Sequence, residues 1–262
     1  MNLNLQDKRA IVCGSTQGIG KATAIGLARL GATVTLLARN EQALQATAQE
    51  LPTPNGQVHH YLCADFGNPA KVQAVIDEWK ATHGGAHILI NNTGGPPAGQ
   101  AIDASLEEYT DAFTKHLLCN QLLAKALVEY MKAAHFGRIV NIISTSVREP
   151  IAGLGVSNTI RGAVASWAKT LSFELAPFGI TVNNVLPGYT KTARLASLIK
   201  TRAEKQGTTA QAIEQQLLAE VPARRFAEPE EVANAVLFLC SPAAAYITGI
   251  NVPVDGGKIR AL

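Results

Sequence analysis

The chain has 262 residues, of which 47% are hydrophobic and 16% are charged, so its composition predicts a folded protein with a large core and excludes an intrinsically disordered one. The net charge of +3 is dispersed, with no basic stripe of the kind that binds nucleic acid. Residues 1–7 show no basic segment followed by an apolar one, and no apolar run approaches the ~20 residues that span a bilayer. The four cysteines form no CxxC pair, which indicates reduced thiols in a cytoplasmic protein without membrane attachment.

Short apolar runs alternate with longer stretches of helical period along the chain. The predicted strands are Ala10–Cys13, Thr33–Leu37, Val58–Cys63, His87–Asn91, Arg138–Ile143, Thr181–Leu186 and Asn251–Val254. The predicted helices are Gly18–Leu30, Glu41–Leu51, Pro69–His83, Leu106–Ala134 (interpreted as two helices), Gly155–Phe178 and Pro229–Cys240. This alternation predicts an α/β fold, a doubly wound parallel sheet of the Rossmann type, as a single domain over residues 1–262.

One polar segment, Lys191–Glu220, interrupts this alternation before the last helix and strand. Its composition is helical. Long insertions in compact α/β domains are usually functional, so we interpret residues 191–220 as a lid over a binding site. A surface excursion without a function is the alternative.

A glycine-rich turn follows the first predicted strand directly and opens the first predicted helix. Glycines at such a turn let the backbone approach a pyrophosphate, and the helix N-terminus offers that anion unpaired N–H groups and a positive dipole end. We therefore expect a dinucleotide to contact Gly14, Ser15, Gln17, Gly18, Ile19 and Gly20.

The turn after the second strand indicates which dinucleotide binds. A carboxylate there would accept from a ribose hydroxyl and repel a phosphate, whereas an arginine accommodates the phosphate. The chain has neutral Ala38 followed by Arg39, which favours NADP(H) over NAD(H). The alternative is that Arg39 is only a solvated surface charge.

The glycine spacing Gly-x-x-x-Gly-x-Gly resembles that of the short-chain dehydrogenase/reductase family, although Cys13 stands where the family usually has Thr. The segments Asn91–Gly94, Pro187–Thr192 and Phe226–Gly257 are also similar to family motifs, in the same order. The resemblance implies that Asp65 contacts the adenine amino group, that the Asn91–Gly94 segment packs beneath the cofactor, and that the Pro187–Thr192 segment holds the nicotinamide carboxamide. The cofactor-binding residues expected from it are Asp65, Phe66, Asn92, Gly94, Pro187, Gly188, Thr190 and Thr192. The closing segment is most similar to 3-oxoacyl carrier-protein reductases, which implies a 3-oxoacyl or similar ketone as substrate.

The same resemblance exposes a departure at the catalytic positions. Ser144 aligns with the family's catalytic serine, but Ser157 stands at the position of the catalytic tyrosine and Arg161 at that of the lysine. His116 aligns with the family's asparagine. A serine hydroxyl is a far weaker acid than a phenol, and an arginine cannot exchange a proton at working pH. Arg161 keeps the positive charge and is still expected to bind the nicotinamide ribose, whereas the usual general acid is missing.

Several residues are candidates for a replacement acid. His116 has an ordinary pKa in the useful range, with a hydrogen-bonded structural histidine as the alternative. Tyr189 lies beside the nicotinamide segment, where an aromatic contact under the lid is the favoured interpretation. Arg148 and Glu149 line the substrate pocket or belong to a solvated loop. The six histidines show no metal-ligand spacing, so no metal is expected.

These observations predict an NADP(H)-dependent oxidoreductase that acts on a small carbonyl or alcohol substrate. One alternative is a dinucleotide-binding protein without turnover, a sensor or a partner subunit. A further alternative is an enzyme whose substrate supplies its own acid. The resemblance also implies a homo-oligomer, a dimer or tetramer, that pairs the helices at Leu106–Ala134 and Gly155–Phe178.

Overall fold

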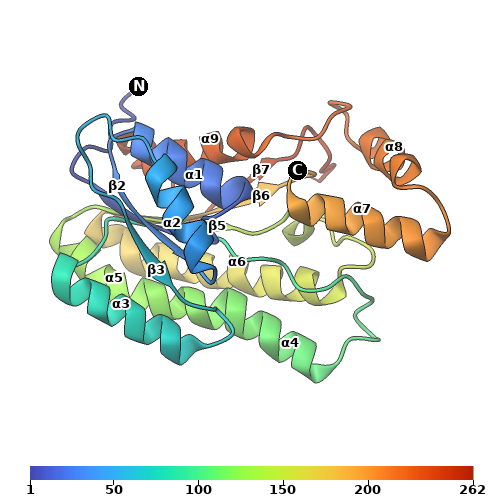
Figure 1. The fold of residues 1–262 in the computed structure, drawn as a ribbon, viewed down its shortest axis with the longest axis horizontal. Coiled ribbons are helices and arrows are strands. Elements are labelled where there is room, and N and C mark those ends of the chain that lie inside the picture. Colours follow the sequence, from blue (N-terminus) through green and yellow to red (C-terminus); the bar gives the residue numbers. More distant parts are fainter. Residues whose placement is uncertain (262) are drawn as a thin grey trace.

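The computed structural model, which describes residues 1–261, contains one seven-stranded sheet in the order β3-β2-β1-β4-β5-β6-β7 (Figure 1). The strands are β1 (Arg9–Cys13), β2 (Thr33–Ala38), β3 (His60–Cys63), β4 (Ile88–Asn91), β5 (Gly137–Ile142), β6 (Ile180–Pro187) and β7 (Asn251–Val254). Every neighbouring pair is parallel. The order reverses between β1 and β4, as a doubly wound sheet requires, so the predicted fold class is confirmed.

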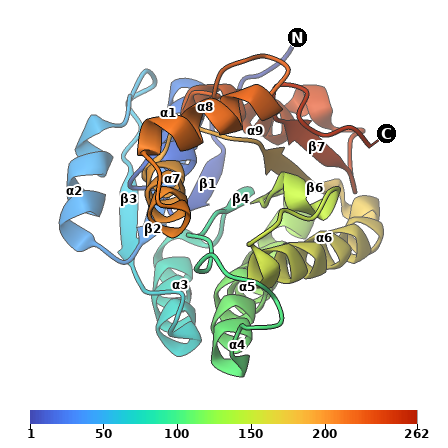
Figure 2. The same cartoon turned by 90° about the vertical axis from the view of Figure 1, so that its right-hand side faces the viewer.

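Helices cover both faces of the sheet (Figure 2). One face carries α1 (Gly18–Arg29), α2 (Glu41–Glu50) and α9 (Pro229–Cys240). The opposite face carries α3 (Pro69–His83), α5 (Cys119–Ala133) and α6 (Gly155–Leu175). Because the strands are buried on both sides, they appear in the sequence as continuous apolar runs instead of alternating ones.

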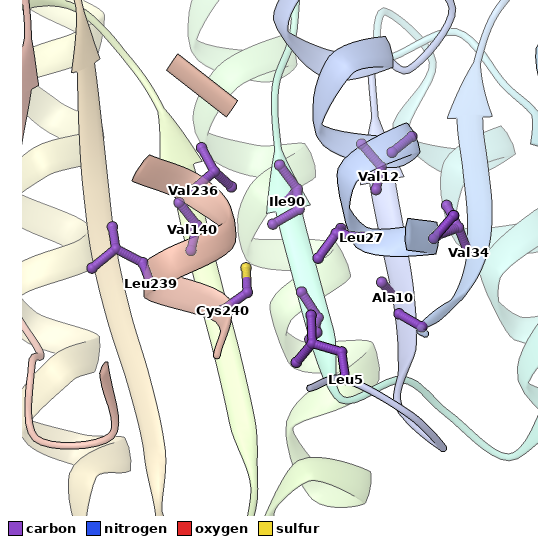
Figure 3. Close-up of a cluster of buried hydrophobic side chains, with 14 of the residues drawn as sticks. Leu5, Ala10, Val12, Leu27, Val34, Ile90, Val140, Val236, Leu239 and Cys240 are labelled. Carbon is purple, nitrogen blue, oxygen red and sulfur yellow. The ribbon is translucent and has the colours of Figure 1, made fainter. Parts of the chain in front are cut away.

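The apolar layer between the sheet and α1 and α9 is drawn in Figure 3. Val12 and Ile90 project from the sheet toward Leu27 of α1 and Val236 of α9, and all four side chains are fully buried. The two helices approach closely at Gly26, where an added Cβ would lie 2.4 Å from Leu237 Cδ1. Burial on this scale contributes about 1.5–3 kcal/mol for each large aliphatic side chain.

Several predicted boundaries differ from the structure, most of them by one residue. Strand β3 begins at His60, two residues later than predicted, because Val58 is 69% exposed and outside the sheet. The stretch Leu106–Ala134 contains two α-helices as predicted, α4 (Leu106–Phe113) and α5, and a π-helical turn at Thr114–Leu118 connects them. No glycine or proline interrupts this stretch, so nothing breaks the helix. The wider π-turn contains His116, which is buried inside the molecule.

A row of asparagine side chains links β4 to β7, and those of Asn91, Asn141 and Asn184 are buried. Asn91 Nδ2 donates to Asn141 Oδ1 at 2.8 Å, and Asn141 Nδ2 donates to Asn184 Oδ1 at 2.9 Å. Asn184 Nδ2 then donates to Asn251 Oδ1 at 2.8 Å. These four residues are register partners on neighbouring strands. The row links four neighbouring strands at one level through side-chain amides, and Asn91 Oδ1 is left without a hydrogen-bond partner among residues 1–261.

The predicted lid region contains the helices α7 (Ala193–Gln206) and α8 (Ala210–Glu220). They stand at one end of the molecule, outside the helices that cover the sheet (Figure 1). Leu195 of α7 packs with Ile213 and Leu217 of α8 in a small apolar cluster that also contains Phe226. No helix in the described part of the chain is long and apolar enough to cross a membrane.

Candidate active site

A cavity of about 560 Å³ lies at the carboxyl ends of the strands. Segments that follow β1 to β6 all contribute to its wall. The residues predicted from the sequence that line it are Gly14, Gln17, Gly18, Ile19, Arg39, Asp65, Phe66, Asn92, Gly94, Ser144, Ser157, Arg161, Pro187, Gly188, Thr190 and Thr192. The other three, Ser15, Gly20 and His116, lie outside this lining. Folding therefore gathers almost the whole predicted set, from most of the length of the chain, around one space.

The glycine-rich turn has a backbone that only glycine adopts easily. Gly14 and Gly18 have φ values of +57° and +53°, in the left-handed region. An added Cβ at Gly20 would lie 2.1 Å from the carbonyl oxygen of Gly14. Asn92 supports the turn from the end of β4, since its Nδ2 donates to Cys13 O at 3.3 Å and to Gly14 O at 3.1 Å. The turn and the β4 loop are thus one rigid unit.

The start of α1 is suited to an anion. Gln17 occupies the N-cap position in an extended conformation and makes no side-chain cap hydrogen bond. The hydroxyl of Ser15 is fully buried and has no hydrogen-bond partner. Unpaired N–H groups, an unpartnered hydroxyl and a positive dipole end fit a pyrophosphate, so these residues can hold a dinucleotide.

Arg39 and Asp65 lie at the ends of β2 and β3. Arg39 Nη1 is 4.0 Å from Asp65 Oδ2, and the two side chains are 79% and 51% exposed. Asp65 Oδ1 also accepts from the backbone N–H of Gly67 at 2.7 Å, which fixes the carboxylate. The guanidinium is consequently held only loosely, at the rim of the cavity, and is free to bind a phosphate.

Ser144, Ser157 and Arg161 meet at the other end of the cavity. Ser144 follows β5, and its Oγ accepts from the N–H of Ser146 at 3.1 Å, which leaves the hydroxyl proton available to a ligand. Ser157 and Arg161 lie one turn apart on α6 and are 9% and 8% exposed. Ser157, which we predict at the family's tyrosine position, is therefore a small buried hydroxyl one helical turn from a buried cation.

Arg161 is held by backbone carbonyls. Its Nη1 donates to Ile142 O at 3.0 Å and its Nη2 to Thr93 O at 3.4 Å, whereas Nε has no partner. Burial, with a smaller effect from the charge of Arg194, lowers the pKa of Arg161 to about 10. The group is still a cation at neutral pH.

His116 is a neutral, structural side chain. Its Nδ1 lies 2.5 Å from Thr93 Oγ1, so the ring is behind the wall that Thr93 forms. Burial and then the charge of Arg161 lower the pKa of His116 to about 2, against a smaller opposing effect of a hydrogen bond with Gly94. The prediction that His116 titrates near neutrality is wrong, because desolvation beside a cation excludes the imidazolium.

Tyr189 and Glu149 make contacts within the protein, and these contacts argue against either group as the acid that protonates a substrate. Tyr189 OH donates to Glu220 Oε2 at 2.8 Å and its ring contacts Phe226 at an edge, which fits the predicted aromatic contact under the lid. Burial and Glu220 raise the pKa of Tyr189. Glu149 Oε1 accepts from the N–H groups of Arg260 and Ala261, and it fastens the C-terminal segment instead of lining the cavity.

Three cationic residues in the cavity wall were not predicted from the sequence, namely Lys115, Arg194 and Lys258. They come from the π-turn, the start of α7 and the C-terminal segment, so no local pattern connects them. Of the three, only the position of Arg194 could have been suspected from the sequence, since it lies two residues after Thr192 at the start of the polar insertion. Its Nη2 donates to Pro96 O at 2.5 Å, across the cavity mouth.

Comparison with known proteins agrees with this geometry. A family model described as Enoyl-(Acyl carrier protein) reductase matches residues 14–258. The 3-oxoacyl-[acyl-carrier-protein] reductase of Vibrio cholerae serotype O1 is 34% identical over 255 residues, which are 97% of this chain and 98% of that protein. The NADPH-dependent reductase BacG of Bacillus subtilis is 28% identical over 259 residues, or 98% of this chain and 100% of that one.

Among solved structures, the L-sorbose reductase from Gluconobacter frateurii, complexed with NADPH and L-sorbose, is 32% identical and covers 100% of both chains with a TM-score of 0.93. The likeness therefore extends over the whole fold and includes every segment that lines the cavity. Because the family model matches residues 14–258 of the 262 in this chain, the chain belongs to the short-chain dehydrogenase/reductase family. It is an oxidoreductase acting on a carbonyl or alcohol group.

Proposed function

We propose that the protein is an NADP(H)-dependent reductase of ketones that works with Ser157 and Arg161 in place of the family's tyrosine and lysine. One observation carries the proposal: a single cavity joins the glycine-rich turn, Arg39 and the Ser144–Arg161 end. Its length suits an extended dinucleotide with a small substrate beside the nicotinamide. Relatives named as NADPH-dependent reductases, one crystallised with NADPH and a sugar, support this assignment.

Each part of the cofactor has a matching group in the wall. The pyrophosphate would bind at the start of α1 beside Ser15, and the phosphate that distinguishes NADP(H) would bind Arg39. Asp65 would accept from the adenine amino group. Thr190 and Thr192 would hold the carboxamide, and Arg161 the nicotinamide ribose. When bound, NADPH supplies a hydride to the carbonyl carbon.

The residues of this chain then have to stabilise the carbonyl oxygen as it gains negative charge. The Ser144 hydroxyl can donate to that oxygen, and Arg161 places a positive charge nearby. Neither supplies a proton readily, since a hydroxyl is a weak acid and a guanidinium does not ionise at working pH. The small side chain of Ser157 leaves room for a water, which we propose as the proton donor.

A slow reaction is the expected consequence. A positioned general acid typically contributes 10²–10⁴ in rate, so a water-dependent reduction runs slower than in relatives by a factor of that order. The same feature favours two other candidates: a dinucleotide-binding protein without turnover, and an enzyme whose substrate carries its own acid. The proposed substrate remains a 3-oxoacyl or similar ketone.

We also propose a cytoplasmic homo-oligomer that pairs along the α4–α5 and α6 surfaces. Large apolar side chains are exposed there, including Leu118 at 44% and Phe173 at 70%. Burying such a surface is the usual driving force of subunit association. All four cysteines are free and three are buried, which is consistent with a reducing compartment.

The decisive experiment measures NADPH consumption against a panel of ketones, including 3-oxoacyl thioesters, with NADPH affinity measured in parallel. We expect slow turnover of some ketones and a dissociation constant for NADPH well below that for NADH. Ser144→Ala should retain NADPH affinity and lose turnover. Tight NADPH binding without any turnover would instead identify a binding protein.

A further inference from the structure

The charged side chains around the cavity are strongly unbalanced. The cations in its wall are Arg39, Lys115, Arg161, Arg194 and Lys258, and the carboxylate is Asp65. Three of these cations have acidic partners within 4.0 Å, namely Arg39 with Asp65, Lys115 with Asp111 and Lys258 with Glu220. Within residues 1–261, Arg161 and Arg194 have no carboxylate within that distance.

Arg194 reaches over the cavity from the lid. It is the second residue of α7, and its Nη2 donates to Pro96 O in the loop after β4. The same guanidinium lies against Gly95, where an added Cβ would be 3.5 Å from Nη2. The contact with one carbonyl leaves other N–H donors of the guanidinium available to a ligand, and Arg194 lines the cavity.

Arg161 and Arg194 line the same cavity and carry like charges. Burial lowers the pKa of Arg161, and the charge of Arg194 adds a smaller effect in the same direction. Two like charges without a counterion raise the free energy of the empty site, and an anion bound between them would lower it. The planar fork of an arginine matches the oxygen geometry of a carboxylate or phosphate.

The proposed cofactor does not account for Arg194. Its pyrophosphate is matched by the start of α1 and Ser15, its remaining phosphate by Arg39, and its nicotinamide ribose by Arg161. Arg194 instead comes two residues after Thr192, which we propose to hold the carboxamide, and it lines the same cavity as Ser144 and Ser157.

We propose that Arg194 recognises an anionic group, a carboxylate or a phosphate, on the carbonyl substrate. The inference rests on the proposed function and deepens it, because it restricts the substrate class to anionic ketones, such as oxo acids. It also assigns a task to the lid, since α7 carries the recognising side chain and brings it over the cavity with the substrate.

The test compares matched substrates that differ only in charge. Each oxo acid is paired with its methyl ester, for example levulinate with methyl levulinate and acetoacetate with methyl acetoacetate. The proteins are wild type, Arg194→Gln, Arg194→Lys and the control Lys200→Gln, which removes an exposed charge from the same helix outside the cavity wall. The ratio of kcat/KM for acid over ester is measured together with the dissociation constant for NADPH.

We expect wild type and Lys200→Gln to prefer the acids. Arg194→Gln should lower kcat/KM for the acids by roughly 10- to 100-fold, leave the esters nearly unchanged, and leave NADPH affinity unchanged. Arg194→Lys should recover part of the preference. An acid-to-ester ratio near one in wild type, or one that survives in Arg194→Gln, overturns the inference while the reductase assignment stands.

Two further outcomes are separated by binding measurements. If Arg194→Gln weakens NADPH binding by the same factor as kcat/KM, Arg194 serves the cofactor and the inference is wrong. If no ketone is reduced, the reductase assignment fails, and calorimetric titration of levulinate and its ester into the NADP⁺-loaded protein decides the inference. Binding of the acid alone, lost in Arg194→Gln, supports it, whereas equal binding or none overturns it.

Discussion

The imidazole of His116 is hydrogen-bonded to the hydroxyl of Thr93, with Nδ1 and Oγ1 2.5 Å apart. Thr93 lines the cavity, and its carbonyl oxygen accepts from Arg161, so His116 supports the catalytic end from behind. His116, which we predict at the family's asparagine position, is therefore a buried, neutral, hydrogen-bonded side chain and not an acid.

The pH dependence of stability should report this burial. The folded protein excludes the His116 proton down to a pH of about 2, whereas the unfolded chain binds it below about 6.5. The unfolded state thus takes up more protons as the pH falls through this window. The free energy of unfolding should decrease by up to about 1.4 kcal/mol for each pH unit below 6.5.

Urea unfolding of wild type and His116→Gln between pH 7 and 4 measures this slope, with His135→Asn at an exposed histidine as control. Burial also lowers the pKa of His87, to about 4, and this contribution is common to all three proteins. Parallel slopes in wild type and His116→Gln would show that His116 can ionise in the folded state.

The shape of the pH dependence of kcat should not depend on His116. A histidine acting as general acid would give kcat a limb near its pKa, and its removal would abolish that limb. Because His116 stays neutral, we expect His116→Gln to change kcat by the same factor at every pH from about 5.5 to about 8.5, without changing the shape of the profile. Disappearance of a limb in the variant would return the acid role to His116.

Cofactor preference should depend on Arg39. Its guanidinium is exposed and only loosely paired with Asp65, so it is available to the phosphate that NADH lacks. Arg39→Ala should weaken NADPH binding by about 1–3 kcal/mol and leave NADH binding nearly unchanged. Fluorescence titration of both cofactors checks this, with Arg29→Ala as an exposed control on α1. Equal wild-type affinity for the two cofactors would contradict the NADP(H) assignment.

Substitutions of Ser157 and of Arg161 should have different effects on cofactor binding and on the reaction rate. Arg161→Met removes the proposed ribose contact and also leaves the carbonyls of Ile142 and Thr93 without a donor, so NADPH affinity and thermal stability should both fall. Ser157→Ala should change neither. The pair Ser157→Tyr with Arg161→Lys should raise kcat if the cavity accepts the ring, and overpacking would appear as a lower melting temperature. Loss of NADPH binding in Ser157→Ala alone would contradict the assignment.

The lid should exchange amide hydrogens more slowly once ligands bind. Helices α7 and α8 share a small apolar cluster and join the rest of the molecule partly through Arg194 and Pro96. We expect rapid exchange in residues 193–220 of the free protein and protection with NADPH and substrate, whereas buried α9 should be slow in both states. Equally high protection in the free protein would indicate a purely structural segment.

The sequence alone determined the parallel sheet, its helices and most of the segments that line the cavity. Those features follow from local signals, since buried strands need continuous apolar runs and the turn at Gly14–Gly20 needs glycines whatever the rest of the chain does. The predicted departure at Ser157 and Arg161 rests on the same kind of local signal, because residue identity at a fixed helical spacing does not depend on packing.

Only the tertiary structure decided the electrostatics of the site. The pKa of His116 depends on burial and on the charge of Arg161, which lies 45 residues away in sequence, so no local pattern could show that this histidine is neutral. The boundary between α4 and α5 likewise became a π-turn through packing, without a sequence break. Arg194 lines the cavity because the start of α7 contacts the loop that contains Pro96. Which partners a charged side chain has depends on which distant segments fold together, so the sequence pattern alone does not show them.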